Sequence, residues 1–282
     1  MKYSHIILGF LIALFRFLYK EDKDIVTTRY VYRSDRVPYA FDGYRIVQVS
    51  DFHNARFGRR SRNLLSKIKE ADGDVIFVTG DIIDRRTPYL KRSLRFIDQL
   101  TEILPTYYVT GNHEAHYKHF GKLECAIEQS DMKNISRTSD RLYIGNEYIH
   151  LLGLEDLWFY GGEEDPMTMD RFEMSLRERL QDKDDRLTLL MAHRPDQIGL
   201  YSRFPIDLVF TGHAHGGQIR LPFVKGLYAP HQGILPKYTE GVHTKNGTSV
   251  VISRGLGNSR FPFRVFNHPE IVIVDLEREV HS

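Results

Sequence analysis

Five short apolar segments of this 282-residue chain end in acidic, amide or imidazole side chains, and this repetition restricts the fold more than any other feature. Each segment is rich in Val, Ile or Leu, as a buried strand is. Because sites in parallel-sheet proteins form beyond the carboxyl ends of the strands, we expect the five clusters to converge on one crevice. In chain order they are Ser50-Asp51-Phe52-His53, Gly80-Asp81-Ile82-Ile83-Asp84, Gly111-Asn112-His113-Glu114, Ala192-His193 and Gly212-His213-Ala214-His215.

The segments between these clusters alternate between strand and helix patterns. This βαβα order implies right-handed crossovers and a largely parallel sheet, and a hairpin pattern over 141–152 then indicates a mixed or second sheet. No linker interrupts the elements, so a single α/β domain is expected. Strands are predicted at 44–50, 75–78, 106–109, 141–144, 148–152, 187–191, 208–210, 249–253 and 271–275, and helices at 64–71, 90–100, 122–129 and 169–180.

The amino terminus carries an uninterrupted apolar run over residues 6–15. This run is shorter than the roughly 20 residues of an ordinary membrane span, and no small-residue cleavage site of a secretory signal follows it. We therefore predict that residues 1–24 form an uncleaved hydrophobic helix that associates with a membrane, followed by a globular domain over 40–282. A first helix packed against that domain is the alternative. More basic residues follow the run than precede it, which favours the cytoplasmic face.

Composition excludes several broad classes of protein. With 41% apolar residues and a net charge of +2, the chain lacks the low hydrophobicity and high charge of a disordered protein. The small net charge also gives no electrostatic footprint for nucleic acid, so a nucleic-acid partner is not expected. The single cysteine, Cys125, excludes an internal disulfide and a cysteine-ligated metal site.

The side chains in the five clusters suit a pair of divalent metal ions. Carboxylates, an amide oxygen and neutral imidazoles are ligands for Mn²⁺, Fe, Zn²⁺ or Mg²⁺. Three glycines, Gly80, Gly111 and Gly212, each precede a candidate ligand and permit a tight turn or a close approach there. Taken singly, an Asp-x-His or Gly-Asn-His sequence is typical of an ordinary loop, but five such clusters in order predict a metal centre.

Together, the five motifs resemble those of the calcineurin-like metallophosphoesterases, and the resemblance extends from about Tyr44 to the end of the chain. The segment 212–222 resembles the bacterial branch of membrane-associated phosphoesterases, some of which are similar to UDP-2,3-diacylglucosamine hydrolases. The resemblance implies a four-layer α/β/β/α sandwich with two mixed sheets, here preceded by the amino-terminal hydrophobic helix. It also implies a location at the inner membrane of a bacterium.

The resemblance implies a role for each site residue. One metal ion takes Asp51, His53 and His215, the second takes Asn112, His193 and His213, and Asp81 bridges both. His113 matches the family's catalytic histidine, and Glu114 stands where an acidic side chain orients that histidine. No motif position is missing.

This site implies hydrolysis of a phosphodiester or pyrophosphate bond by a hydroxide that bridges the two metal ions, with Mn²⁺ favoured. Six basic residues over 220–264, interleaved with Phe223, Leu227, Phe261 and Phe263, suggest a pocket rim for an anionic, partly lipidic phosphoester. An exposed basic loop packed by its own aromatic residues is the alternative. The six basic residues are Arg220, Lys225, Lys237, Arg254, Arg260 and Arg264.

Three other functions remain open at this point. A nuclease or nucleotide phosphodiesterase would use the same metal ions, and the second and third clusters are compatible with a protein Ser/Thr phosphatase. A metal-binding scaffold without activity is the non-enzymatic alternative, which the complete set of ligands disfavours. The expected partners are the phosphoester substrate and a membrane surface, with no obligate protein partner.

Overall fold

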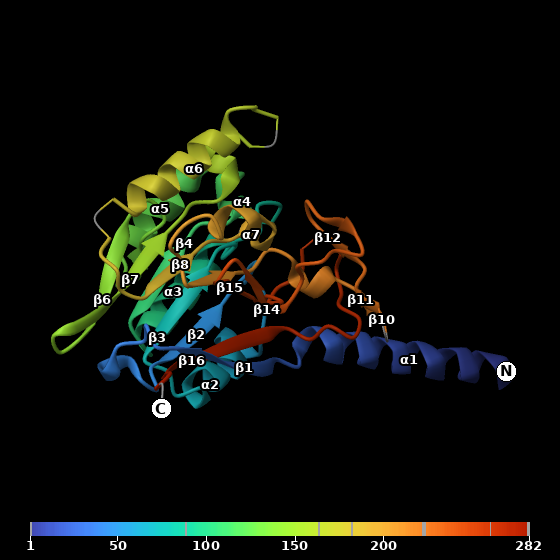
Figure 1. Cartoon of the computed structure of the whole chain (residues 1–282). Coiled ribbons are helices and arrows are strands. Elements are labelled where there is room, and N and C mark those ends of the chain that lie inside the picture. Colours follow the sequence, from blue (N-terminus) through green and yellow to red (C-terminus); the bar gives the residue numbers. More distant parts are fainter. Residues whose placement is uncertain are drawn as a thin grey trace.

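Two six-stranded sheets pack face to face in the computed structural model, which describes residues 2–87, 89–162, 164–181, 183–221, 224–259 and 261–280 (Figure 1). The first sheet contains, in spatial order, β1 (Val26–Ser34), β16 (Glu270–Arg278), β2 (Arg45–Val49), β3 (Val75–Thr79), β4 (Thr106–Val109) and β5 (Lys133–Asn134). The second contains β14 (Gly241–Lys245), β15 (Thr248–Ile252), β9 (Leu208–Thr211), β8 (Thr188–Met191), β7 (Glu147–Gly153) and β6 (Ser139–Ile144).

Both sheets are mixed, with parallel strands at their centres. Strands β2, β3, β4 and β5 run parallel, as do β7, β8, β9 and β15, whereas β16, β6 and β14 each pair antiparallel with a neighbour. The central strands β3, β4, β8 and β9 are buried along their whole length, which explains their continuous apolar sequences.

Three apolar cores separate four layers. Between the sheets, the rings of Phe77 and Phe210 meet with centroids 5.1 Å apart. On the outer face of the first sheet, residues such as Leu64 and Phe96 anchor α2 (Arg62–Glu70), α3 (Leu90–Thr101) and α5 (Phe120–Glu128). On the outer face of the second, Phe172 anchors α6 (Thr168–Arg179), and α7 (Ile198–Tyr201) contributes Ile198 and Leu200 to the same core. The predicted α/β/β/α sandwich is thus confirmed.

Two strands of five or more residues, β1 and β14, were missed by the sequence patterns. Strand β1 lies outside both predicted ranges, 1–24 and 40–282, yet it pairs in parallel with β16 along its whole length. It is an edge strand whose residues alternate between half-buried and exposed, so it lacks a continuous apolar run. Strand β14 forms a hairpin with β15 and is likewise mostly exposed. Further short strands form two small hairpins over 220–234: β10 (Arg220–Leu221), β11 (Val224–Gly226), β12 (Tyr228–Ala229) and β13 (Gly233–Ile234).

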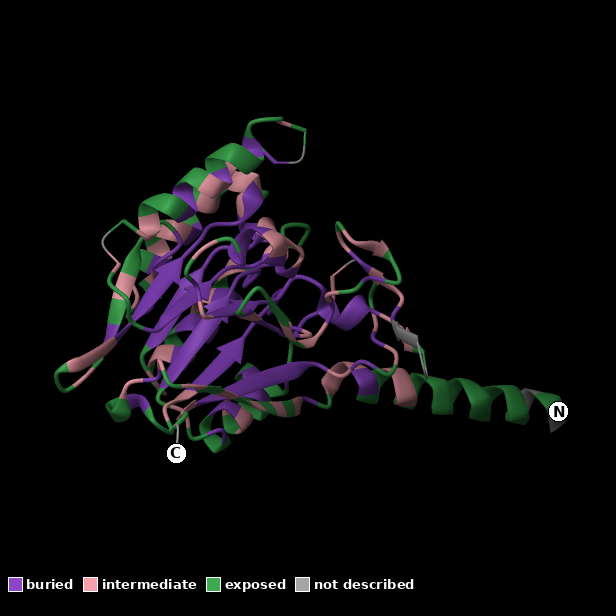
Figure 2. Ribbon diagram, in the orientation of Figure 1, coloured by how far each residue is buried: buried purple, intermediate pink, exposed green. Residues whose placement is uncertain are grey.

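The amino-terminal helix α1 (Lys2–Lys23) extends away from the sheets, and Figure 2 shows it exposed along most of its length. Among the residues that the structure describes, the carboxyl end of α1 contacts the domain: Phe17 packs on Phe266 with ring centroids 5.5 Å apart, and Glu21 is buried. No helix in the described part of the chain is both long enough and apolar enough to cross a membrane. The exposed apolar side chains of α1 are those of Tyr3, Ile6, Ile7, Leu8, Phe10, Leu11, Ile12, Leu14, Phe15 and Tyr19.

Candidate metal centre and active site

The seven predicted ligands meet at the carboxyl ends of β2, β3, β4, β8 and β9, as the sequence predicted. Six of them form two groups, Asp51, His53 and His215 in one and Asp81, His193 and His213 in the other, and a third group joins His113 to His53 and Asp81. Within each group the ligand atoms lie within 4.8 Å of one another. All six residues are buried. The amide of Asn112, the first residue of the short helix α4 (Asn112–Ala115), joins the second group.

In the first group, Nε2 of His215 lies 3.3 Å from Oδ1 of Asp51 and 3.2 Å from Nε2 of His53. In the second group, Nε2 of His193 lies 3.2 Å from Oδ1 of Asn112 and 3.1 Å from Nδ1 of His213. Such short distances between potential ligand atoms are expected of side chains that bind the same metal ion.

Asp81 lies between the two groups. Its Oδ2 is 3.6 Å from Nε2 of His53 and 3.3 Å from Nε2 of His193. Its Oδ1 instead accepts a hydrogen bond from the backbone N–H of His113 at 2.7 Å. One carboxylate oxygen is therefore held by the protein while the other faces both groups, as a bridging ligand requires.

Backbone carbonyls fix the orientation of two ligand imidazoles. Nδ1 of His53 lies 3.2 Å from the carbonyl oxygen of Ile83, and Nδ1 of His193 lies 2.7 Å from that of Thr79. A ring that donates Nδ1–H to a carbonyl keeps the lone pair on Nε2, the atom that faces the group in both residues. These contacts select the tautomer that binds metal.

Burial and charge set the protonation of the site. Burial opposes ionisation of Asp81, but His193 and His113 outweigh it and hold the pKa of Asp81 well below its usual range. Burial lowers the pKa of His215 to about 3 and also moves that of His213 well below its usual range. Asp81 is therefore a carboxylate, and His213 and His215 are neutral near pH 7, the forms that ligate divalent metal ions. Burial opposes protonation of His193, but Asp81 raises the pKa of that ring to about 10, so a metal ion must displace its proton.

The backbone at the ligands is held in an uncommon conformation. Asp51, His53, Asp81, His213 and His215 have φ values of 51°, 45°, 54°, 66° and 48°, in the left-handed region that costs free energy for residues other than glycine. Two glycines make this packing possible. Gly80 has φ +93°, and a Cβ on Gly212 would lie 1.9 Å from Oγ of Ser50.

The donor set fits two divalent ions. Three imidazole–carboxylate contacts of 3.3–3.8 Å lie within the first group and between that group and Asp81. All donors are hard or borderline ligands.

We expect metal analysis to find two ions per chain. Chelation should abolish hydrolysis of bis-p-nitrophenyl phosphate and lower the melting temperature, because ions that bind only the folded chain stabilise it. Adding Mn²⁺ should restore both. A chelated protein that keeps its activity and melting temperature would contradict the presence of a metal centre.

His113 lies beside the two groups, and its surroundings differ from the prediction. Its Nδ1 accepts a hydrogen bond from the backbone N–H of Arg85 at 3.1 Å and lies 3.5 Å from Oδ1 of Asp84. Glu114 does not orient His113. Its carboxylate accepts hydrogen bonds from the backbone N–H groups of Asp81, Ile83 and Gly111 and so joins two ligand loops. That prediction was wrong because adjacent residues on a helix point in different directions.

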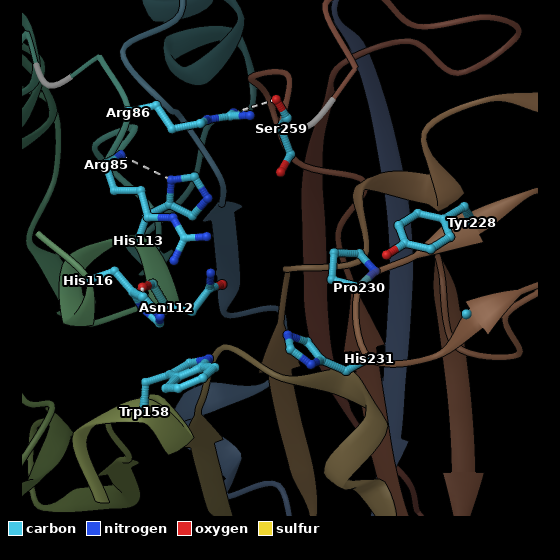
Figure 3. A pocket seen from close by; sticks show the side chains of 11 residues that line it. Arg85, Arg86, Asn112, His113, His116, Trp158, Tyr228, Pro230, His231 and Ser259 are labelled. Carbon is cyan, nitrogen blue, oxygen red and sulfur yellow. Dashed lines mark hydrogen bonds between the residues drawn. The ribbon is translucent and has the colours of Figure 1, made fainter. Parts of the chain in front are cut away.

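A pocket of about 630 Å³ opens beside His113 and Asn112 (Figure 3). Its lining includes Arg85, Arg86, His116, Trp158, Tyr228 and His231. Arg86 pairs with Asp84, whereas no ion pair within the described residues includes Arg85, whose guanidinium points into the pocket in Figure 3. The sequence motifs gave no role to these lining residues, although Arg85 directly follows Asp84, the last residue of the second cluster.

Three of the six basic residues that were predicted to form a rim over 220–264 are instead bound by other parts of the chain. Arg220 and Arg254 form ion pairs with Glu240, and Arg254 also pairs with Glu270. Arg264 is buried and donates to the carbonyl oxygens of Arg254, Gly255, Gly257 and Asn267, so it holds a loop together. Lys237 is exposed, whereas Phe223, Arg260 and the side chain of Lys225 lie outside the described residues.

Comparison with known proteins places this geometry in a family. Residues 44–217 match the model described as calcineurin-like phosphoesterase. The chain is 31% identical to the uncharacterized metallophosphoesterase YkuE of Bacillus subtilis over 92% of this chain and 88% of that protein. It is 24% identical to the phosphodiesterase YaeI of Escherichia coli over 83% of this chain and 82% of that protein. The solved structure of TT1561 from Thermus thermophilus has the same fold, with a TM-score of 0.51 and 14% identity over 76% of this chain and 90% of that one.

Proposed function

The chain belongs to the calcineurin-like phosphoesterase family and is a metal-dependent phosphoesterase, and we propose that it hydrolyses a phosphodiester or pyrophosphate bond. The proposal rests on the seven ligand side chains that converge beside His113 and Arg85. Two divalent ions held by these side chains supply the positive charge that activates water and neutralises phosphoryl oxygens. We assign the predicted ligand roles, with Asp81 shared between the two ions, to the same residues.

His113 is the proposed proton donor. Because its Nδ1 accepts the N–H of Arg85, the neutral ring carries its proton on Nε2. The neutral ring can donate this N–H to a phosphoryl oxygen and stabilise its charge, and the imidazolium form can protonate the leaving oxygen and return to neutral imidazole. Asp84 lies close enough to Nδ1 to stabilise the ring when it is positively charged.

The pocket supports an extended anionic substrate rather than a simple monoester. Arg85 offers a cation for a second anionic group, and Trp158 packs edge-on against His116 to form an aromatic wall. The exposed apolar face of α1 further favours an amphiphilic substrate and association with a membrane surface at the cytoplasmic face. The aromatic wall is equally suited to a nucleobase, so a nucleotide phosphodiester is the second candidate.

A panel of substrates tests this proposal. With Mn²⁺ present, we expect turnover of bis-p-nitrophenyl phosphate and of a lipid-linked pyrophosphate such as UDP-2,3-diacylglucosamine to exceed turnover of p-nitrophenyl phosphate. Faster hydrolysis of the monoester would contradict the proposal. Efficient cleavage of single-stranded DNA or of cyclic nucleotides would favour the nucleotide alternative instead.

A further inference from the structure

A second cavity, of about 220 Å³, lies in the loop between β2 and α2, separate from the pocket at the metal centre. Five arginines line it, Arg56, Arg59 and Arg60 from the loop and Arg92 and Arg95 from α3, together with Gln99. We call this cavity the arginine pocket. The metal centre uses none of these side chains.

The arginine pocket carries positive charge that no acidic side chain among the described residues pairs with. Within the ranges that the structure describes, no ion pair includes any of the five arginines, whereas Arg220 and Arg254 at the metal-centre side are paired with Glu240. Burial and the neighbouring charges of Arg56 and Arg95 lower the pKa of Arg92. Like charges held together in this way favour a bound anion.

The pocket is held in shape by the backbone. Gly58, Arg60 and Ser61 have φ values of 74°, 56° and 58°, so the loop makes a tight left-handed turn. Gln99 donates a hydrogen bond to the carbonyl oxygen of Arg60 at 3.4 Å. On the other wall, Arg92 donates to the carbonyl oxygen of Asn54 and stacks on Tyr89 at 4.9 Å. These contacts fix the positions of the backbone segments that carry the arginines.

The arginine pocket lies next to the base of α1. The ammonium group of Lys23, the last residue of α1, lies 5.6 Å from the ring centre of Phe57, which is between Arg56 and Gly58 in the same loop. The base of α1 is itself fixed, because Glu21 accepts a hydrogen bond from the backbone of Asn267 and Asp22 accepts one from that of Arg264. The exposed apolar part of α1 and the arginine pocket thus have a defined relative position.

We propose that the arginine pocket binds the phosphate groups of anionic phospholipids when α1 lies in a membrane surface. Guanidinium groups bind phosphate oxygens in pairs of parallel hydrogen bonds. Membrane binding by an interfacial helix increases with its buried apolar area and with electrostatic attraction to anionic lipids, so a basic patch beside α1 strengthens the attachment. This inference rests on the proposed membrane association of α1 and not on the proposed hydrolysis.

Binding of the full-length protein to vesicles tests the arginine pocket. The vesicles contain phosphatidylcholine with or without phosphatidylglycerol, and the variant is R59Q/R60Q. Its matched control, K183Q/K245Q, removes the same charge near the amino ends of β8 and β15. These strand ends lie at the end of the second sheet that is opposite the metal centre. Metal content and melting temperature, measured for every variant, establish that each one is folded.

We expect R59Q/R60Q to bind vesicles containing phosphatidylglycerol roughly 30-fold more weakly than wild type, since each cation near an anionic surface contributes roughly five-fold. The control should retain wild-type binding, and high salt should remove the difference. Equal losses for the two variants, or no loss for R59Q/R60Q, would overturn the proposal. The proposal would also be overturned if R59Q/R60Q weakened the binding of inorganic phosphate or of an oligonucleotide more than it weakened the binding of vesicles. An F10E variant that loses binding to both kinds of vesicle separates the contribution of α1.

Discussion

Replacement of Asp81 by asparagine is expected to lower kcat/KM for a phosphodiester by at least about 10³-fold and to remove bound metal. Asp81 is 1% exposed, and its Oδ2 lies within 3.6 Å of an imidazole from each ligand group. Asparagine keeps the size of the side chain but loses the negative charge that two cations would share. Metal ions contribute several kcal/mol to charge stabilisation in phosphoryl transfer, and each 1.36 kcal/mol is a tenfold change in rate.

The experiment compares Asp81→Asn with Asp98→Asn, which removes an exposed carboxylate from α3. Activity, metal content and the rise in melting temperature on adding Mn²⁺ are measured for both. Asp81→Asn should lose all three, and Asp98→Asn should keep them. If Asp81→Asn retained two metal ions and wild-type kcat/KM, Asp81 could not be the shared ligand.

Local sequence was sufficient to predict that the candidate ligands lie together, because each follows the end of one of five strands within a few residues. The strand ends bring Asp51, Asp81 and His193 together whatever the loops do. The same reasoning explains why the four layers could be predicted from the alternation of strands and helices. Gly80 and Gly212 were also identified correctly, because close approach beside a ligand leaves no room for a Cβ.

Features that depend on distant partners could not be predicted in this way. Strand β1 pairs with β16 near the opposite end of the sequence, and neither its composition nor its spacing indicates this partner. The charge of Arg264 suggested that it binds an anionic substrate, but its guanidinium instead donates hydrogen bonds to backbone carbonyl oxygens that the loop brings close to it. The arginine pocket combines a loop after β2 with α3, so its charge is distributed over two segments that look ordinary when taken separately.

Replacement of His113 by glutamine should lower kcat by about 10²–10⁴-fold, the usual contribution of general acid catalysis, while two metal ions remain bound. His113 forms a third group with His53 and Asp81, but its Nδ1 is occupied by the N–H of Arg85, and the proposed ligand set is complete without it. Its loss should therefore leave KM and metal content nearly unchanged. The matched control is His119→Gln, an exposed histidine that precedes α5 and lies outside the pocket.

The leaving group distinguishes the two ways in which His113 could act. If Nε2–H of His113 protonates the leaving oxygen, the loss of activity in His113→Gln should be small for a p-nitrophenyl ester, whose leaving group departs easily as an anion. It should grow steadily through a series of phosphodiesters as the pKa of the leaving alcohol rises. A loss of equal size for every leaving group would mean that His113 stabilises charge on the phosphoryl oxygens instead. Loss of metal from His113→Gln, or an unchanged kcat, would contradict both roles and place His113 among the ligands or outside the reaction.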